Sequence, residues 1–375
     1  MEGTLTDGAV RVGEDARQRF YDARGYGRPL DRNRIELAPV EAAHLLARGD
    51  LDAVVDEDGD ETVRLDFRGF LVRTGATLRF AVYKDLRDRG FYLSPARAEW
   101  PGVGDDTAAD DVDFVVYPRG KGPWDDAVAY RIRVAGEREP VRADSLGGVT
   151  LAVVDEDGEL TYFETDGEPA LVADASGQVD ADGAAADADE SASPRDTESA
   201  SDLPESVEAD LLGDRVVCYG DADALYERRF YGQRLFGRNA ETGPLQLSLV
   251  EGAYLAQRGV VDADPDAVVA LGREVEGERF DRRLRTYAAL RDRGVVPKSG
   301  FKFGADFRVY AEFTGVDSLS HSTDLVRAVA PDHVFHPRDL SLDVRLAGGV
   351  RKRMVFALTA ANGEIDWLSV ARLTP

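Results

Sequence analysis

The chain has 375 residues, a length typical of two or three domains, and a formal net charge of −25. Its single cysteine, Cys218, excludes an internal disulfide and a metal site built on paired cysteines. No apolar run approaches the length that a membrane span needs. The first residues lack the basic start and apolar core of a signal peptide, so we expect a cytoplasmic protein without membrane contact.

The first half of the chain predicts two helices followed by strands. Residues 39–49 place apolar side chains at helical spacing and end at a glycine, with His44 on the apolar stripe and therefore in the core. A second amphipathic helix ends at the RDRG of residues 87–90. Residues 113–117 and 153–163 then read as strands, with an acidic turn in the second segment.

Residues 165–210 form an acidic segment of different composition. The segment is rich in Asp, Glu, Ala, Ser and Gly, contains no aromatic residue and shows no apolar period. Such a composition cannot bury enough apolar surface to offset the entropy of ordering the chain. We therefore predict a disordered linker that carries about half of the net negative charge.

The sequence after the linker repeats the sequence before it. RFYDARGYGR recurs as RFYGQRLFGR, LAPVEAAHLLARGDLD as LSLVEGAYLAQRGVVD, YKDLRDRG as YAALRDRG, DFVVY as DFRVY, and DEDGELTYF as AANGEIDWL. Five matches in the same order indicate a tandem duplication. The predicted fold class is α/β with α+β, each copy being a small α+β module followed by an α/β nuclease-like module with a mixed sheet. The expected boundaries are 1–70 and 71–164 for copy one, 165–210 for the linker, and 211–274 and 275–375 for copy two.

The second module of copy two contains most of the predicted strands. They follow the amphipathic helix that ends at residue 294, and each alternates apolar and polar side chains. The predicted strands are FRVYAEF, LVRAVA, LDVRLAG, KRMVFALTA and DWLSVARL.

Copy two contains three reactive side chains, of which copy one keeps only the tyrosine. Tyr310 corresponds to Tyr117, but the second module of copy one has no histidine to match His321, and Gly147 stands opposite Lys352. Singly, these residues are typical of a strand core, an exposed histidine and a basic turn. Together they provide a base, an acid and a cation, which metal-free RNA cleavage requires: the 2′-OH loses a proton, the leaving 5′-oxygen gains one, and the phosphorane charge is stabilised.

Two further histidines, His333 and His336, lie in a proline-flanked loop. They resemble half of a metal site, but no carboxylate or cysteine pattern accompanies them. We expect no metal and no cofactor.

The segments GFKFGADFRVY, His321 with STDLVRAV, and VRLAGGVRKRM resemble the catalytic half of the archaeal tRNA-splicing endonucleases, or tRNA-intron lyases. The spacings of 11 residues from Tyr310 to His321 and 31 from His321 to Lys352 also match that family. The acid-rich composition is similar to that of proteins from salt-loving archaea, which implies a haloarchaeal type.

The resemblance covers nearly the whole chain and implies a function in some detail. It implies the duplicated form of the enzyme, which pairs as a homodimer and cuts precursor tRNA at bulge-helix-bulge splice sites without a metal. The products would be a 2′,3′-cyclic phosphate and a 5′-hydroxyl. It assigns the general base to Tyr310, the general acid to His321 and transition-state stabilisation to Lys352.

The resemblance also implies how RNA and a second protomer are bound. Arg345, Arg351 and Arg353 lie with Lys352 in a stretch without acidic residues, which is suited to phosphates. By the family pattern, Arg345 and Trp367 hold an unstacked bulge base across the dimer, and cation–π contact would strengthen that pair. The acidic turn of copy one, Asp155, Glu156 and Asp157, would contact the partner chain.

Two other functions fit parts of the sequence. A Mg²⁺-dependent, restriction-type DNA nuclease would need clustered carboxylates near the strand of Lys352, and none is present, so we expect no DNA partner. A non-catalytic RNA-binding subunit would fit copy one, whereas copy two keeps all three reactive side chains. Activity in EDTA separates the first alternative, and the effect of His321→Ala on cleavage separates the second.

Overall fold

The computed structural model describes residues 1–57, 62–104, 111–171, 204, 206–237, 240–313, 315–316, 319 and 321–375. This chain forms two compact units. The first contains Met1–Asp166, Val334–Leu342 and Val370–Pro375, and the second contains Gly167–His333 and Asp343–Ser369. Each unit is built mainly from one of the two sequence copies.

Most of the predicted linker lies outside the described residues, and strands take in its two ends. β12 (Leu160–Asp166) and β13 (Val207–Leu212) enter residues 165–210 from either side. In β13 the residues Val207 and Ala209 are buried and alternate with exposed acidic residues. The high acid content of the segment concealed this short period-two pattern.

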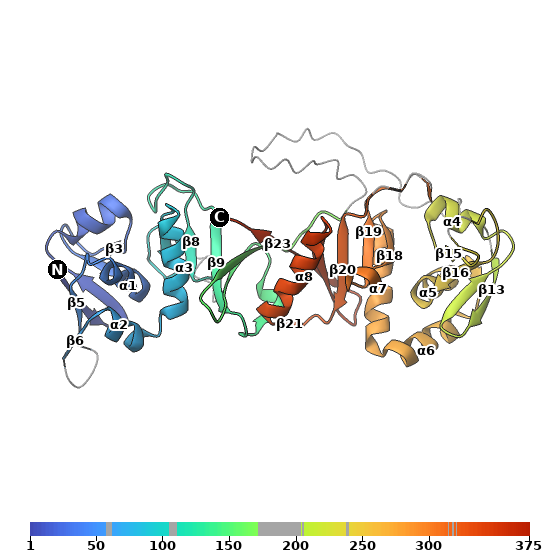
Figure 1. Ribbon diagram of the computed structural model, residues 1–375, viewed down its shortest axis with the longest axis horizontal. Helices are drawn as coiled ribbons and strands as arrows, with labels where there is room; N and C mark the ends of the chain where they lie inside the picture. The colour runs from blue at the N-terminus through green and yellow to red at the C-terminus, as the bar shows by residue number, and fades with distance from the viewer. Residues whose placement is uncertain are drawn as a thin grey trace. The chain divides into compact units, whose positions relative to one another are not determined.

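The first unit begins with a mixed sheet covered by helices (Figure 1). β1 pairs in parallel with β5, whereas β1–β2, β2–β4, β3–β4 and β5–β6 are antiparallel. Helix α1 (Pro39–Ala47) is buried along most of its length, and α2 (Phe67–Thr74) follows the sheet. The strands, in spatial order, are β3 (Arg28–Pro29), β4 (Ile35–Leu37), β2 (Ala9–Val12), β1 (Glu2–Thr6), β5 (Ala53–Asp56) and β6 (Val63–Leu65).

The remainder of the first unit is a helix and a second mixed sheet. α3 (Thr77–Asp88) packs against β7, β9 and β11. β9 and β11 are parallel neighbours, and β8–β9, β7–β8 and β11–β12 are antiparallel. The strands that precede β12 are β7 (Leu93–Pro95), β8 (Phe114–Val116), β9 (Tyr130–Gly136) and β11 (Thr150–Val154), with the short β10 (Val141–Arg142) between the last two.

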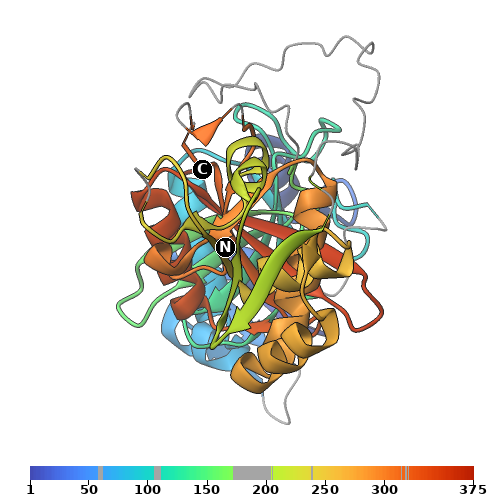
Figure 2. The same cartoon turned by 90° about the vertical axis from the view of Figure 1, so that its right-hand side faces the viewer.

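The second unit repeats this plan. In its first sheet β13 and β17 are parallel, and β13–β14, β14–β16 and β15–β16 are antiparallel. α5 packs on this sheet, and α6 and α7 contact α5 (Figures 1 and 2). The elements are β14 (Arg215–Cys218), α4 (Asp223–Arg229), β15 (Gln233–Arg234), β16 (Leu245–Ser248), α5 (Leu249–Gln257), β17 (Val261–Asp262) and α6 (Pro265–Glu276).

The second sheet of this unit has the same order of pairings as its counterpart. β18–β19 and β19–β20 are antiparallel and β20–β22 is parallel. In chain order, copy two continues with α7 (Glu278–Asp292), β18 (Val296–Ser299), β19 (Phe307–Tyr310), β20 (Asp324–Val329), β21 (Val334–Phe335), α8 (Pro337–Gly349), β22 (Arg353–Thr359) and β23 (Ile365–Leu373). The matching orders and orientations confirm the predicted duplication and fold class.

One predicted strand is wrong. Residues 342–348, read as LDVRLAG with alternating apolar side chains, lie in helix α8. The helix begins at Pro337, a favoured first helical position. It buries Leu340, Val344 and Ala347 and leaves Leu342 46% exposed, so the helical stripe overrode the apparent alternation.

His44 lies in the core of the first unit, as its place on the α1 stripe predicted. The side chain is 3% exposed, and its Nδ1 lies 2.9 Å from the hydroxyl of Tyr26. Burial lowers the pKa of His44 to about 4, and nearby Arg87 acts in the same direction. Among the described residues, no helix is both long and apolar enough to cross a membrane.

Candidate active site

Strand pairing brings the three predicted catalytic residues to one end of the second sheet of copy two. Asp324, the first residue of β20, pairs with Val309 of β19 on one side and with Arg353 of β22 on the other. Tyr310 follows Val309 and Lys352 precedes Arg353. Because neighbouring strands are about 4.8 Å apart, the backbones of Tyr310 and Lys352 lie on the order of 10 Å from each other.

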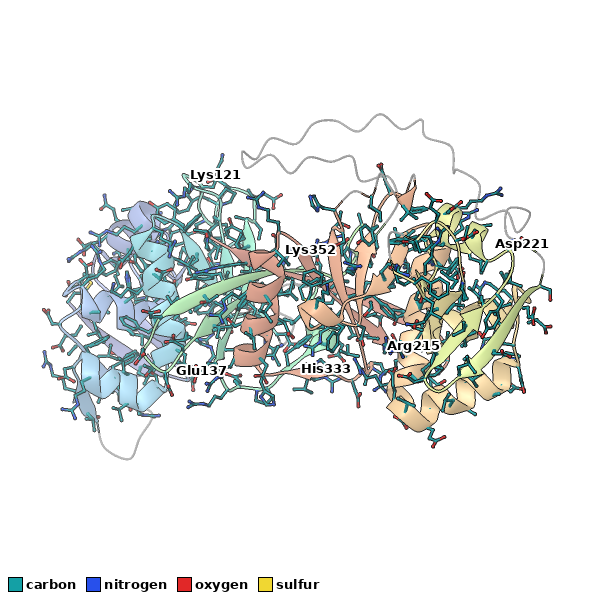
Figure 3. All side chains as sticks on the ribbon, turned by 45° about the vertical axis from the view of Figure 1, so that its right-hand side comes forward. Lys121, Glu137, Arg215, Asp221, His333 and Lys352 are labelled. Atoms are coloured by element: carbon teal, nitrogen blue, oxygen red, sulfur yellow. The ribbon has the colours of Figure 1, made fainter. Side chains whose placement is uncertain are left out.

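Lys352 lies in the turn between α8 and β22 (Figure 3). Its Nζ donates a hydrogen bond to the backbone carbonyl of Ser322, which is the residue after His321. It also lies 5.8 Å from the centre of the Phe303 ring. Burial lowers the pKa of Lys352 and the charge of Arg308 lowers it further, whereas Asp324 raises it. An ammonium has three N–H donors, so donors remain for a substrate after the bond to Ser322.

Tyr310 ends β19 and is mostly buried, with 7% of its surface exposed. Its ring packs edge-on against Phe230 at 5.9 Å between centroids. The guanidinium carbon of Arg308 lies 5.6 Å from the centre of the Tyr310 ring. Within the described ranges the Tyr310 hydroxyl has no hydrogen-bond partner, so the protein leaves this oxygen available to a ligand.

His321 is exposed, three residues before β20 begins. Lys352 donates a hydrogen bond to the carbonyl of Ser322, the next residue in the chain, and the N–H of Thr323 donates to the carbonyl of Val309 at 2.9 Å. These two bonds fix the His321 segment to the strands of Tyr310 and Lys352. All three residues therefore lie at the same end of three neighbouring strands, β19, β20 and β22.

The tyrosine of copy one has a different environment. Tyr117 is 1% exposed, and its hydroxyl oxygen lies 2.8 Å from both Ser94 Oγ and the carbonyl oxygen of Pro101, so it can donate to the carbonyl and accept from the serine. Burial raises the pKa of Tyr117 to about 12. The residues that cover it belong to the connection 96–113, whereas the same connection in copy two spans only 300–306. Copy one thus keeps the tyrosine as a core residue.

The strand registers confirm the residue that replaces Lys352. In copy two Val326 pairs with Phe307 and Val355, and in copy one Ile132 pairs with Phe114 and Thr150. The equivalence of Val355 with Thr150 places the residue three positions earlier, Lys352 or Gly147, at the same point of each sheet.

The lysine depends on a helix that copy one does not have. Helix α8 leads directly to Lys352, and the N–H of Lys352 still donates to the carbonyl of Ala347 at 2.9 Å. At the matching place copy one has a single turn of 3₁₀ helix, Ala143–Ser145. Copy one therefore differs in the element that positions the cation as well as in the residue itself.

The basic residues predicted to bind RNA differ in their surroundings. Arg345 on α8 and Arg351 in the following turn are exposed. Arg353 is partly buried: its Nε lies 2.7 Å from Asp324, and its Nη2 donates to the carbonyl of Ala170 at 2.8 Å. Arg353 is therefore committed to holding the start of β22.

Trp367, the other predicted base-binding residue, is 8% exposed in β23 and packs in the core of the second unit. Arg293 lies 4.6 Å above its ring. One face of the indole is thus already in a cation–π contact within the same chain.

The acidic turn of copy one contains one structural residue and two exposed ones. Asp155 accepts hydrogen bonds from the N–H groups of Asp157 and Glu159 and so shapes the turn between β11 and β12. Glu156 lies 2.6 Å from Arg138. Asp157 is exposed at the tip.

The two histidines considered as half of a metal site lie near the start of α8. His333 is partly buried, which lowers its pKa, and His336 is exposed. In the parts of the chain that the structure describes, no group of three His, Cys, Asp or Glu side chains could hold a metal ion.

Sequence reasoning missed Arg308, whose guanidinium lies beside the Tyr310 ring and whose charge lowers the pKa of Lys352. Its counterpart in copy one is Val115, because Arg308 pairs with Leu325 and Val115 with Arg131 at matching positions of the two sheets. The two copies differ here as clearly as they do at Lys352. Comparison of DFRVY with DFVVY carried that signal.

Comparisons with known proteins agree with the internal repeat. The profile described as the tRNA intron endonuclease N-terminal domain matches twice, at residues 1–67 and 207–271. The profile of the catalytic C-terminal domain of the same family matches residues 280–367. The N-terminal module is thus recognised in both copies and the catalytic module in copy two.

Similar proteins match the chain from end to end. A tRNA-splicing endonuclease of Haloferax volcanii is 60% identical over 375 residues, which is all of both chains. One of Haloarcula marismortui is 54% identical over the full length of both chains, and one of Methanosarcina mazei is 35% identical over all of this chain and 99% of its own. The chain therefore belongs to the tRNA intron endonuclease family and is an endonuclease.

Proposed function

We propose that this endonuclease removes introns from precursor tRNA by cutting at bulge-helix-bulge splice sites without a metal ion. The observation that carries the proposal is the meeting of Tyr310, His321 and Lys352 at one edge of the catalytic sheet, with Lys352 bonded to the carbonyl next to His321. The full-length relatives are named tRNA-splicing endonucleases.

The chemistry uses each side chain once. The Tyr310 oxygen takes the proton of the 2′-OH, which attacks the adjacent phosphorus. His321 gives a proton to the departing 5′-oxygen, for which imidazole is suited near neutral pH. Lys352 stabilises the added negative charge on the phosphorane. The phosphate closes onto the 2′-oxygen, so the products are a 2′,3′-cyclic phosphate and a 5′-hydroxyl.

The role of the tyrosine is supported by the contrast between the copies. The Tyr117 hydroxyl is bonded inside the protein and buried, whereas the Tyr310 hydroxyl meets no hydrogen-bond partner in the described chain. Arg308 lies beside the Tyr310 ring, and copy one has Val115 at the matching position. Copy one then serves as a scaffold.

The proposed RNA contacts rest mainly on exposed arginines. Arg345 and Arg351 are free to meet phosphates or a flipped base. Trp367 has little exposed surface and already carries Arg293, so the base clamp rests chiefly on Arg345. Arg353 acts indirectly, through its bond to Asp324 at the start of β20.

The homodimer belongs to the same proposal. A precursor tRNA needs two cuts per intron, and each chain has one complete set of reactive side chains, so two chains supply both sites. Of the acidic turn, Glu156 and Asp157 are exposed and able to contact a partner chain, while Asp155 shapes the turn that presents them. Sedimentation of the pure protein at high salt would test this stoichiometry.

The cleavage proposal is tested with an intron-bearing tRNA transcript in EDTA. We expect excision of the intron and fragments that end in a cyclic phosphate and a 5′-hydroxyl. His321→Ala should remove cleavage with little change in RNA affinity, and His336→Ala, which alters another exposed histidine of copy two, should cleave normally. Cleavage that requires added Mg²⁺, or an unchanged rate in His321→Ala, would refute the proposed chemistry.

A further inference from the structure

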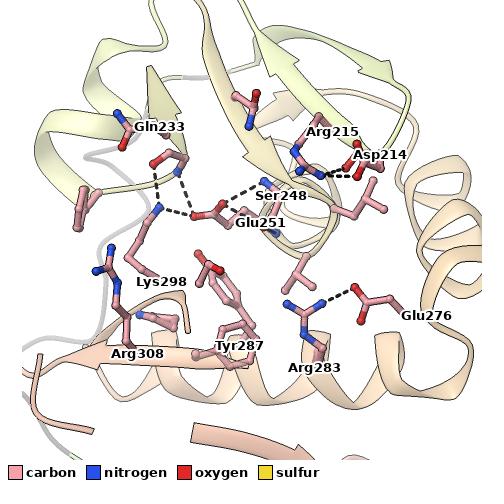
Figure 4. Close-up of a pocket in the computed structure, with 18 of the residues that line it drawn as sticks. Asp214, Arg215, Gln233, Ser248, Glu251, Glu276, Arg283, Tyr287, Lys298 and Arg308 are labelled. Carbon is pink, nitrogen blue, oxygen red and sulfur yellow. Dashed lines mark hydrogen bonds and ion pairs between the residues drawn. The ribbon is translucent and has the colours of Figure 1, made fainter. Parts of the chain in front are cut away.

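A cavity of about 420 Å³ lies inside the second unit, beside the strand that ends in Tyr310 (Figure 4). It is bounded by residues of β16, the start of α5, α7, β18 and β19. Its volume is within the range of pockets that hold small ligands or parts of larger ones. Aromatic side chains, including Phe230, line it together with glutamines and charged groups.

Most charges that line this cavity neutralise one another. Lys298 lies 2.8 Å from the buried carboxylate of Glu251, and Arg215 lies 2.7 Å from Asp214. The cavity also holds an ion pair of Arg283 with Glu276. Figure 4 shows these three pairs as dashed contacts around the opening.

Arg308 differs from the other cations of the cavity. In the described part of the chain it has no acidic partner, and its Nε is buried without a hydrogen-bond acceptor. A buried donor without an acceptor costs free energy, so it indicates a place that a ligand completes. Arg308 also pairs directly with Lys298 across β18 and β19. Two like charges that face each other in a sheet are unfavourable, and Glu251 offsets only the charge of Lys298.

Copy one has lost both cations from this place. The pair that corresponds to Lys298 and Arg308 is Ser94 with Val115. The buried glutamate is kept as Glu41, but its partner is the indole of Trp100, whose Nε1 donates to Glu41 Oε2 at 3.2 Å. The degenerate copy thus replaces two charges with neutral groups and fills the space with an aromatic ring.

The cavity also adjoins the proposed catalytic groups. Phe230 lines it and packs against Tyr310, and Lys298 Nζ lies 5.0 Å from the centre of the Phe230 ring. Arg308 precedes Tyr310 by two residues on one strand, so both side chains leave the same face of the sheet. A group bound by Arg308 would therefore lie beside the tyrosine oxygen.

We propose that this cavity is a subsite for a nucleotide next to the cut, with the phosphate of that nucleotide bound by Arg308 and its base or sugar against Phe230. A guanidinium matches two phosphate oxygens at once, and an aromatic ring accepts an unstacked base. The inference rests on the proposed RNA-cleaving function and adds a residue that positions the substrate.

The test measures RNA affinity in a His321→Ala background, where the substrate stays intact. Arg308→Gln should weaken binding of the intron-bearing transcript by about 10-fold or more. It should also reduce the slope of log affinity against log salt by about 0.7 to 0.9, the loss of one phosphate contact. Arg308→Lys should lie between the two, and Arg68→Gln, at an exposed arginine of α2 in copy one, should change neither quantity.

A second variant guards against a change in folding. Gln246→Trp fills the cavity from β16 without altering charge and should weaken binding as Arg308→Gln does. Circular dichroism should show both variants folded. Unchanged affinity and salt slope in both would overturn the inference.

Two further outcomes distinguish a substrate subsite from a site for a free nucleotide and from a failure of the proposed function. Adenosine 5′-monophosphate, titrated into the protein, reports a site for a free nucleotide. If Arg308→Gln abolished that binding and left RNA affinity unchanged, the substrate subsite would be refuted. If the wild-type protein failed to cut the transcript, the proposed function would fail, while the affinity series would still decide the role of Arg308.

Discussion

Replacing Lys298 with methionine should destabilise the second unit, because it leaves the Glu251 carboxylate buried without a counter-charge. Glu251 is 7% exposed and accepts hydrogen bonds from the N–H of Gly232 and from Ser248. Its pKa is lowered: burial acts to raise it, and Lys298 opposes burial most strongly. The stability of this carboxylate therefore depends on one neighbouring ammonium.

The expected loss is about 3 kcal/mol. Breaking a buried ion pair by removing one partner costs roughly 3–5 kcal/mol, and the bonds from Gly232 and Ser248 that remain place Glu251 at the lower end. For a unit of this size, each kcal/mol shifts the melting temperature by about 2–4 °C, so the midpoint should fall by roughly 6–12 °C. The pair is buried, so the loss should persist at high salt.

The sign of the pH dependence follows from the two carboxylate environments. In the wild type the folded pKa of Glu251 is lowered, so its contribution is present above the unfolded value near 4.3 and is lost as the pH falls through the folded pKa. In Lys298→Met the bonds from Gly232 and Ser248 remain but the ammonium is gone, so burial should raise the pKa of Glu251, as it does for the similarly hydrogen-bonded Glu41 of copy one. The penalty then disappears on protonation, so the gap between the proteins should narrow from pH 8 toward pH 4.5.

Calorimetry of the whole chain at several pH values measures this gap. The double variant Lys298→Met with Glu251→Gln should recover part of the loss, because no charge remains buried. A loss below about 1 kcal/mol, or one that is the same at pH 4.5 and pH 8, would refute the electrostatic reasoning.

Two other predictions concern copy one. Tyr117→Phe should lower the free energy of unfolding by about 1–2 kcal/mol, because Ser94 and Pro101 lose a buried hydrogen-bond partner, and it should leave cleavage intact. Tyr310→Phe should stop cleavage at nearly unchanged stability. Equal effects of the two variants on cleavage would contradict this division of roles. The pKa of His44 is about 4 in the folded state and about 6.5 in the unfolded state, so the free energy of unfolding of the first unit should fall by up to about 3 kcal/mol between pH 6.5 and pH 4. In His44→Gln, calorimetry should show a weaker dependence of stability on pH over this range.

The sequence predicted the duplication, the fold class and three residues that the strand registers bring to the same end of one sheet. It did so because an internal repeat supplies a second sequence with which each residue can be compared. Tyr310, His321 and Lys352 stand out only against Tyr117 and Gly147.

The remainder depended on spatial information that a linear pattern does not hold. Residues 342–348 alternate like a strand, and only the packing of α8 reveals the helical stripe. Trp367 was expected to meet RNA, and its position beneath Arg293 follows from the fold. The pairing of Lys298 with Arg308 required the register of β18 and β19, which sets which side chains face each other.

The connection 96–113 of copy one bears on any attempt to restore activity there. Introducing a histidine and a lysine into that half would leave Tyr117 buried and hydrogen-bonded to the carbonyl of Pro101. The next residue, Gly102, packs so closely that a Cβ at this position would lie 2.1 Å from the tyrosine oxygen. A revertant would have to shorten this loop and rebuild a helix before residue 147. Point substitutions alone would therefore not restore a second active site, because the loop and the helix that position its residues also differ.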